Sequence, residues 1–188
     1  MTKFTLHTED SAPEASKPML AQSQKDFGMV PGLHAVMAEA PGLLEGYKTL
    51  HKLFVNTSLD KDELTVVWQS INVEHECHYC VPGHTGISRS MGVSDDISEA
   101  LRNETALPSA RLEALRTFTL SVVRNRGVVD EVAVQAFLDA GYNKRQILEI
   151  ILGVAQKVMS NYTNHFAQTP VDDAFKKFSW APAVSKAA

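Results

Sequence analysis

Apolar residues recur at intervals of three and four along most of the chain, which is the spacing of one face of an α-helix. The segment 60–72, for example, places Leu64, Val67, Trp68 and Ile71 on one stripe, as expected of an ordinary core helix. No segment alternates apolar and polar residues for long enough to indicate a β-strand. The pattern therefore predicts an all-α fold.

Residues that favour helix starts divide this pattern into segments. Proline suits a first turn, where no N–H is needed, and Ser, Asp and Asn side chains cap the unpaired N–H groups there. These signals predict helices over 22–27, from Pro31, from Pro41, over 60–72, from the cysteine segment toward Met91, over 94–101, 108–125 and 130–140, and over 144–168.

The chain divides into a short leader and one domain. Residues 1–18 are polar and are expected to be mobile or loosely wrapped, whereas residues 19–188 are predicted to form a single all-α domain. A chain of 188 residues that is 44% hydrophobic is long enough to bury one core.

Charge and hydropathy limit the kinds of partner that we expect. A formal charge of −4 with scattered Lys and Arg gives no electrostatic footprint for nucleic acid. No run approaches the roughly 18 apolar residues of a membrane span, and the first residues lack the apolar segment of a signal peptide. The sequence thus predicts a cytoplasmic protein that binds neither nucleic acid nor membrane.

Both cysteines and three histidines lie within the single stretch 74–84. In a helix, Cys77, Cys80 and His84 share one face, because they are three and four residues apart. The proline and glycine that follow this pair of cysteines suit a first turn, so a helix is expected to begin near 77–81 with the thiols at its N-terminus.

A thiol at a helix N-terminus is suited to redox chemistry. The unpaired N–H groups and the helix dipole lower its pKa from about 8.5 toward 7 or below. The resulting thiolate attacks, and the second sulfur then closes a disulfide, which requires no bound cofactor. His84 lies one turn beyond Cys80, where it can take up the thiol proton.

Other interpretations of the stretch are less consistent with the sequence. Buried cysteines without a chemical role would not need a histidine at the matching helical position. A structural disulfide is unusual in a cytoplasmic chain. Zinc is the strongest rival, but structural zinc sites usually draw their ligands from two separated pairs, and the chain has no further cysteine. The residues that could supply zinc ligands are His75, Cys77, His78, Cys80 and His84.

The motif Cys77-x-x-Cys80-x-x-x-His84 resembles the core motif of the alkyl hydroperoxidase D and carboxymuconolactone decarboxylase superfamily. The later stretches 147–152, 161–166 and 169–172 resemble the closing helix of its peroxidase-related members. The resemblance covers roughly residues 40 to 180, so it extends well beyond the motif.

This resemblance implies an alkyl hydroperoxidase D-like helical bundle that assembles into homo-oligomers. In the hydroperoxidase branch it further implies that Cys80 is the peroxidatic thiol, that Cys77 resolves the oxidised sulfur, and that His84 belongs to a proton relay. The expected partners are a small hydroperoxide substrate and an external dithiol reductant. No cofactor or metal is expected.

The carboxylate of the relay is where the sequence departs from the family pattern. The hydroperoxidase has a glutamate twelve residues before its first cysteine, and Thr65 stands there in this chain. Glu74, three residues before Cys77, is the predicted relay carboxylate, and Glu63 is the alternative. The hydroperoxidase also has a histidine directly before its second cysteine, where this chain has Tyr79.

Several assignments remain open at this point. Asn161 and His165 are candidates to approach the thiols from the last helix, although a histidine there also suits the negative end of the helix dipole. The segment 147–152 is apolar on many faces, so it is expected in the core or at a subunit interface. His34 and His51 are expected to be surface or packing residues.

Two other functions are compatible with the motif. One is a cofactor-free lyase of the decarboxylase type that uses His84 and Glu74 for proton transfer. A full pair of cysteines argues against it, because proton transfer needs no second thiol. The other is a non-catalytic helical protein whose dithiol binds zinc or senses oxidation.

Overall fold

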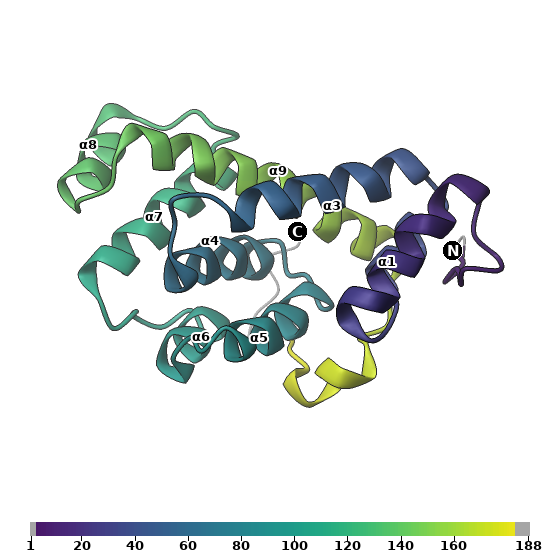
Figure 1. The fold of residues 1–188 in the computed structure, drawn as a ribbon. Helices are drawn as coiled ribbons and strands as arrows, with labels where there is room; N and C mark the ends of the chain where they lie inside the picture. Colours follow the sequence, from purple (N-terminus) through teal and green to yellow (C-terminus); the bar gives the residue numbers. More distant parts are fainter. Residues whose placement is uncertain (1–2, 183–188) are drawn as a thin grey trace.

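The computed structural model describes residues 3–182, which form α-helices and two short 3-10 helices and contain no strand (Figure 1). This confirms the all-α prediction. The elements are η1 (Glu14–Ser16), α1 (Lys17–Phe27), α2 (Gly32–Met37), α3 (Pro41–Val55), α4 (Lys61–Glu74), α5 (Cys80–Ser90), α6 (Asp95–Arg102), α7 (Ala110–Arg124), α8 (Glu131–Asp139), α9 (Lys144–Ala167) and η2 (Asp173–Phe178). Within the described residues, none of these helices is long and apolar enough to cross a membrane.

Side-chain caps explain why the helices begin where the sequence predicts. The Asp60 carboxylate accepts hydrogen bonds from the N–H groups of Asp62 and Glu63, and Glu63 accepts one from the Asp60 N–H in return. Asn143 forms the same reciprocal cap with Gln146 at the start of α9. Each cap satisfies N–H groups that have no partner within the helix.

Two predicted starts differ from the structure. Helix α1 begins at Lys17 rather than near residue 22, with Pro18 in its first turn. Helix α7 begins at Ala110 because the Ser109 hydroxyl accepts a hydrogen bond from the Leu112 N–H, so the cap is Ser109 and Pro108 lies before the helix.

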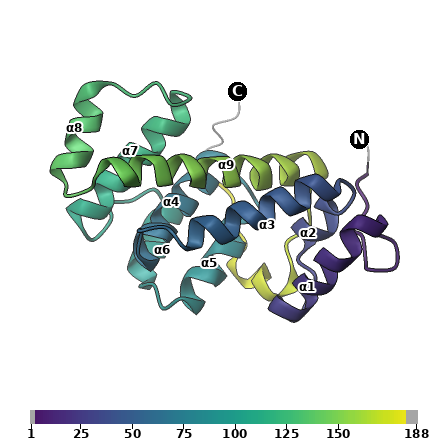
Figure 2. The same cartoon turned by 45° about the horizontal axis from the view of Figure 1, so that its top comes forward.

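Helix α4 lies at the centre of the fold, in contact with α5, α6, α7 and α9. Helix α9 runs along α3 for much of its length (Figures 1 and 2). On one side of this frame, α3, α4, α6, α7, α8 and α9 contribute to an apolar half. It consists of Phe54, Leu59, Leu64, Val66, Val67, Trp68, Ile71, Val93, Ile97, Ala100, Leu101, Leu107, Leu115, Phe118, Val122, Phe137, Tyr142 and Ile150.

On the other side, a second buried cluster contains both cysteines, and we call it the dithiol half. It consists of Ala12, Leu20, Leu33, Met37, Ala38, Leu44, Tyr47, Cys77, Tyr79 and Cys80. The N-terminal segment contributes to it directly, since Ala12 and Ser16 are buried and the Ser16 hydroxyl donates to the Ala38 carbonyl at 2.7 Å. The leader thus packs against the end of α2 and belongs to the cluster that contains the cysteines, and α1 continues across the leader's predicted end at residue 18.

Candidate active site

The turn between α4 and α5 fixes the position of the first cysteine. Helix α4 ends with Glu76 in the left-handed region at φ 51°, where glycine is usual. The Glu76 N–H donates to the Val73 carbonyl at 3.0 Å, and the Cys77 N–H donates to the Asn72 carbonyl at 2.9 Å. These two bonds close the end of α4 and hold Cys77 directly below it.

The two cysteines are neighbours in space. Helix α5 begins at Cys80, and the Cys80 N–H donates to Cys77 Sγ at 3.2 Å. On the other side, Asn164 of α9 donates from Nδ2 to Cys80 Sγ at 3.2 Å. The structure thus has Cys80 as the first residue of a helix and Cys77 in the turn before it, with Pro82 and Gly83 in the first turn of α5.

The surroundings of the two sulfurs push their pKa values apart. Burial strongly raises the pKa of Cys77. Burial also acts to raise that of Cys80, but hydrogen bonds from the Cys77 thiol, the charge of Lys157 and hydrogen bonds from Asn164 and Asn161 lower the pKa of Cys80 to about 6. Near neutral pH, Cys80 is therefore the thiolate and Cys77 the thiol.

Lys157 is a site residue that the sequence analysis missed. It lies on α9 with only 1% of its surface exposed, and its Nζ lies 3.0 Å from His84 Nε2. Burial, Lys157 and His51 lower the pKa of His84 well below its usual value, so this imidazole is neutral. The apolar run that precedes Lys157 predicts a buried helix, and that burial is the one sign in the sequence that its lysine lies inside.

A chain of buried amides connects α9 to the end of α4. Asn161 donates to Asn72 Oδ1 at 3.0 Å and accepts from His75 Nδ1 at 2.9 Å. The His165 ring donates from Nε2 to the His75 carbonyl at 2.7 Å. Asn161 is therefore part of the site, whereas His165 supports the turn that leads to Cys77.

Aromatic rings close the site on the side of α3 and α4. Trp68 is fully buried, lies 4.8 Å from His84 between ring centroids, and donates from Nε1 to Gln156 at 2.8 Å. His51 also stacks on the Trp68 ring, with 5.7 Å between the ring centroids. Burial lowers the pKa of His51 to about 4 and that of His34 to about 3, so both are neutral packing residues.

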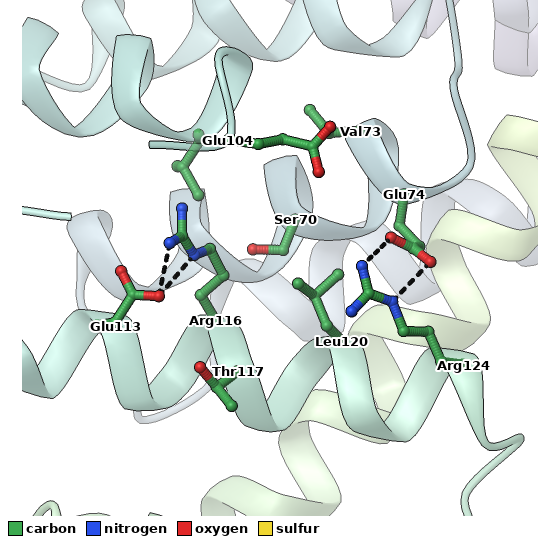
Figure 3. A pocket seen from close by; sticks show the side chains of 10 residues that line it. Ser70, Val73, Glu74, Glu104, Glu113, Arg116, Thr117, Leu120 and Arg124 are labelled. Atoms are coloured by element: carbon green, nitrogen blue, oxygen red, sulfur yellow. Dashed lines mark hydrogen bonds and ion pairs between the residues drawn. The ribbon is translucent and has the colours of Figure 1, made fainter. Parts of the chain in front are cut away.

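The two candidate carboxylates are held by arginines. Both oxygens of Glu74 accept from the Arg124 guanidinium of α7, at 2.8 and 2.7 Å, within a pocket of about 260 Å³ (Figure 3). Glu63 accepts from Arg111 at 2.8 Å. Because Glu63 begins α4 and the cysteines follow its last residue, roughly 16 Å of helix separates Glu63 from the thiols.

The histidines of the motif other than His84 are directed to other partners. His75 donates to Asn161, and His78 donates from Nε2 to the Thr169 carbonyl at 3.0 Å. Among the described residues, no group of three or more His, Cys, Asp or Glu side chains converges as a metal site would require.

Both thiols are enclosed by the fold. Cys77 has no exposed surface and Cys80 only 3%. Tyr79, which lies between them in sequence, bonds to the segments on either side. Its hydroxyl donates to Asp172 at 2.5 Å and accepts from the Leu33 N–H of α2 at 3.1 Å. These hydrogen bonds tie α2 and the segment that follows α9 to the residue between the two cysteines.

Of the three comparisons with known proteins, the one with solved structures finds similar proteins. A scan of family models and a search of curated proteins find no match. The chain has a TM-score of 0.82 and 19% identity with an uncharacterized peroxidase-related protein from Ralstonia eutropha, described as an alkylhydroperoxidase AhpD core, over 92% of this chain and 93% of that one. An uncharacterized peroxidase-related protein from a Silicibacter species matches with a TM-score of 0.77 and 19% identity over 93% of this chain and 97% of that one.

A third structure extends the comparison to another reaction. A cysteine-to-alanine variant of the debrominase Bmp8, in complex with 2,3,4-tribromopyrrole, matches with a TM-score of 0.77 and 16% identity over 94% of this chain and 95% of that one. At such identities the likeness concerns the fold. It confirms the AhpD-like helical architecture that the cysteine motif predicts.

Proposed function

We propose that the protein is a thiol-dependent oxidoreductase that reduces hydroperoxides through Cys80 and Cys77. The observation that carries this proposal is that the two sulfurs are in contact and differ in pKa. The Cys80 N–H donates to the Cys77 sulfur, the pKa of Cys80 is lowered, and the pKa of Cys77 is raised. A peroxidatic thiol must be ionised, and a resolving thiol must stay in reach.

The reaction proceeds in two balanced steps. The Cys80 thiolate attacks the peroxide oxygen, the O–O bond breaks, and Cys80 becomes a sulfenic acid while an alcohol leaves. Cys77 then attacks that sulfur, which forms the disulfide and releases water. An external dithiol, such as a reducing compartment like the cytoplasm supplies, reduces the disulfide.

The contacts of His84 favour a relay role more than those of Glu74 do. His84 is one turn from Cys80 and hydrogen-bonded to Lys157, which suits a role in proton transfer. Glu74 as the relay carboxylate stays a prediction from the sequence, because its two oxygens are engaged by Arg124.

Peroxide consumption by the wild type, Cys80→Ser and Cys77→Ser tests the proposal. Cys80→Ser should fall to the rate without protein. Cys77→Ser should react once and then stop as a sulfenic acid, which a dimedone-type reagent traps. Equal rates in all three proteins would end the peroxidase interpretation.

Reductive dehalogenation is a second candidate, favoured by the likeness to the debrominase fold. The same dithiol can supply two electrons: a C–Br bond is replaced by C–H, bromide leaves, and Cys77 and Cys80 close the disulfide. Bromide release from a brominated pyrrole in the presence of an external dithiol distinguishes this activity from peroxide reduction.

We also expect a homo-oligomer. Helix α9 exposes an apolar stripe that includes Leu148, Ile151, Tyr162 and Phe166, with exposed fractions of 67, 50, 50 and 78%. Such a surface is typical of a subunit interface. Light scattering of the purified chain gives the mass directly, and a monomer at high concentration would contradict the expectation.

A further inference from the structure

Lys157 is a buried cation, so its charge must be balanced by another group of the site. An ammonium group with 1% of its residue exposed is unstable inside a protein unless an anion balances its charge. Its hydrogen-bond partner, His84, is neutral and cannot provide that balance. Burial lowers the pKa of Lys157, and the acidic groups that oppose this lowering are the thiols of Cys80 and Cys77.

The geometry of α9 brings this cation and the reactive sulfur together. Lys157, Asn161 and Asn164 are four and three residues apart, so they share the face of α9 that meets the start of α5. Asn164 contacts Cys80 Sγ, and Lys157 contacts His84, one turn along α5 from that sulfur. The titratable groups that face this site are Cys77, His75 and Tyr79 from the turn, Tyr47 and His51 from α3, and His84 from α5.

The hydrogen bond also fixes the proton on His84. An ammonium can only donate, so Nε2 of His84 accepts and its single proton is on Nδ1. Nδ1 is buried and has no hydrogen-bond partner among the described residues. His84 can therefore receive a proton at Nε2 while it releases one from Nδ1.

We infer that Lys157 is the buried counter-ion of the Cys80 thiolate and the source, through His84, of the proton that the departing oxygen takes up. The proton-source role rests on the proposed peroxide reaction, whereas the counter-ion role does not. In that reaction the alkoxide that is released when the O–O bond breaks receives the Nδ1 proton of His84, and Lys157 returns a proton to Nε2. Thiolate and ammonium become sulfenic acid and amine, so the buried site stays neutral throughout.

The remaining steps close the cycle. Cys77 forms the disulfide with Cys80, and its own proton leaves with the hydroxide as water. An external dithiol then gives two electrons and two protons. One proton restores the Cys77 thiol, and the other enters at Nδ1 of His84 while Nε2 returns its proton to Lys157, which restores the ammonium beside the Cys80 thiolate. Lys157 is thus a positioning residue that acts through charge and through His84, and it needs no contact with the substrate.

Titration of the Cys80 thiolate tests the counter-ion role without any peroxide. In a Cys77→Ser background, absorbance near 240 nm reports one thiolate. Removal of the charge in Lys157→Met should raise the apparent pKa of Cys80 by at least about one unit, a tenfold loss of thiolate at a pH below that pKa. Lys157→Gln gives a second reading if Lys157→Met folds poorly, and an unchanged titration in either folded variant overturns the assignment.

Lys48→Met is the matched control. Lys48 is also partly buried, and it donates to the Met19 carbonyl and the Ser23 hydroxyl, both at 2.8 Å. The same change of charge there should leave the Cys80 titration where it is. A shift as large as that of Lys157→Met would mean that the effect is general rather than local, and would contradict the inference.

Comparison at equal thiolate fraction tests proton donation. At a pH where Cys80 is ionised in both proteins, Lys157→Met should still oxidise several-fold more slowly than its parent, because the leaving oxygen lacks its proton source. Equal rates there overturn the proton-source role. A titration that shifts as expected in a protein that consumes no peroxide would refute the proposed function and leave the counter-ion assignment intact.

Discussion

The two sides of the molecule are joined by helices α4 and α9 and differ in the polar side chains that they bury. The apolar half is filled by aliphatic and aromatic residues from six helices and the loops between them. Around the cysteines, amides, an imidazole and an ammonium are also buried: Asn161 bonds to Asn72, Lys157 to His84, and Asn164 to the Cys80 sulfur. The first half supplies stability by burial, whereas the second holds groups whose charge and protons can change.

Helix α9 contains the transition between the two halves. At Gly153 an added Cβ would come within 2.7 Å of the Phe54 ring, so only glycine allows the close packing seen there. One turn later the same helix turns Lys157 and then Asn161 toward the dithiol. A single rigid element thus anchors the chemistry to the core, which keeps the polar groups in place.

The largest effect is expected from damage to the apolar half. Phe137 is 1% exposed and stacks on Phe118 at 4.3 Å and on Tyr142 at 4.5 Å. Phe137→Ala should lower the free energy of unfolding by about 3–5 kcal/mol in urea denaturation. The Cys80 titration of the folded variant should not change, and a clear shift would mean that the halves are not independent.

A smaller loss of stability is expected when the buried hydrogen bonds around the cysteines are broken. Asn161→Ala leaves Asn72 Oδ1 and His75 Nδ1 without their partner, which costs about 1–3 kcal/mol for a buried group. It should also raise the pKa of Cys80, because Asn161 helps to lower it. Asn56→Ala at the exposed end of α3 is the control and should stay within about 0.5 kcal/mol of wild type.

The dependence of oxidation on pH should reflect the Cys80 thiolate. Because the pKa of Cys80 is lowered to about 6, acidification below that value protonates the sulfur, and the rate should fall tenfold per pH unit. Above about pH 7 the rate should be flat. Stopped-flow oxidation over roughly pH 5 to 8 checks this, and a rate that still climbs tenfold per unit at the upper end indicates an ordinary thiol.

The smallest effect is expected at Glu74, whose partner Arg124 is 51% exposed. A partly exposed ion pair is worth at most about 1 kcal/mol, so Glu74→Gln should change stability by no more than that. Its rate of peroxide consumption should stay close to that of wild type and match that of Arg124→Gln. A large loss of rate in Glu74→Gln alone would support the relay role that the sequence predicts.

Much of the fold could be predicted from local rules. The caps at Asp60 and Asn143 and the start of α5 follow from side chains near each helix end, and the apolar stripe of α4 follows from its period. The cysteine pair was evident because both sulfurs and His84 lie in one segment.

Lys157 and Asn164 were not predicted because they are far from the motif in sequence. A lysine or asparagine is usually exposed, and only the packing of α9 against α5 brings these two to the sulfurs. For the same reason, no local rule distinguished Glu74 from Glu63, since the guanidinium that binds each comes from α7. Contacts between distant helices decide these cases.

The mass of the peroxide-treated protein, taken under denaturing and non-reducing conditions, tests the central claim most directly. If Cys77 and Cys80 close on each other, the mass falls by about two hydrogens and dithiothreitol restores it. A product that instead gains one or more oxygens, or a mass that peroxide leaves unchanged, would contradict the account.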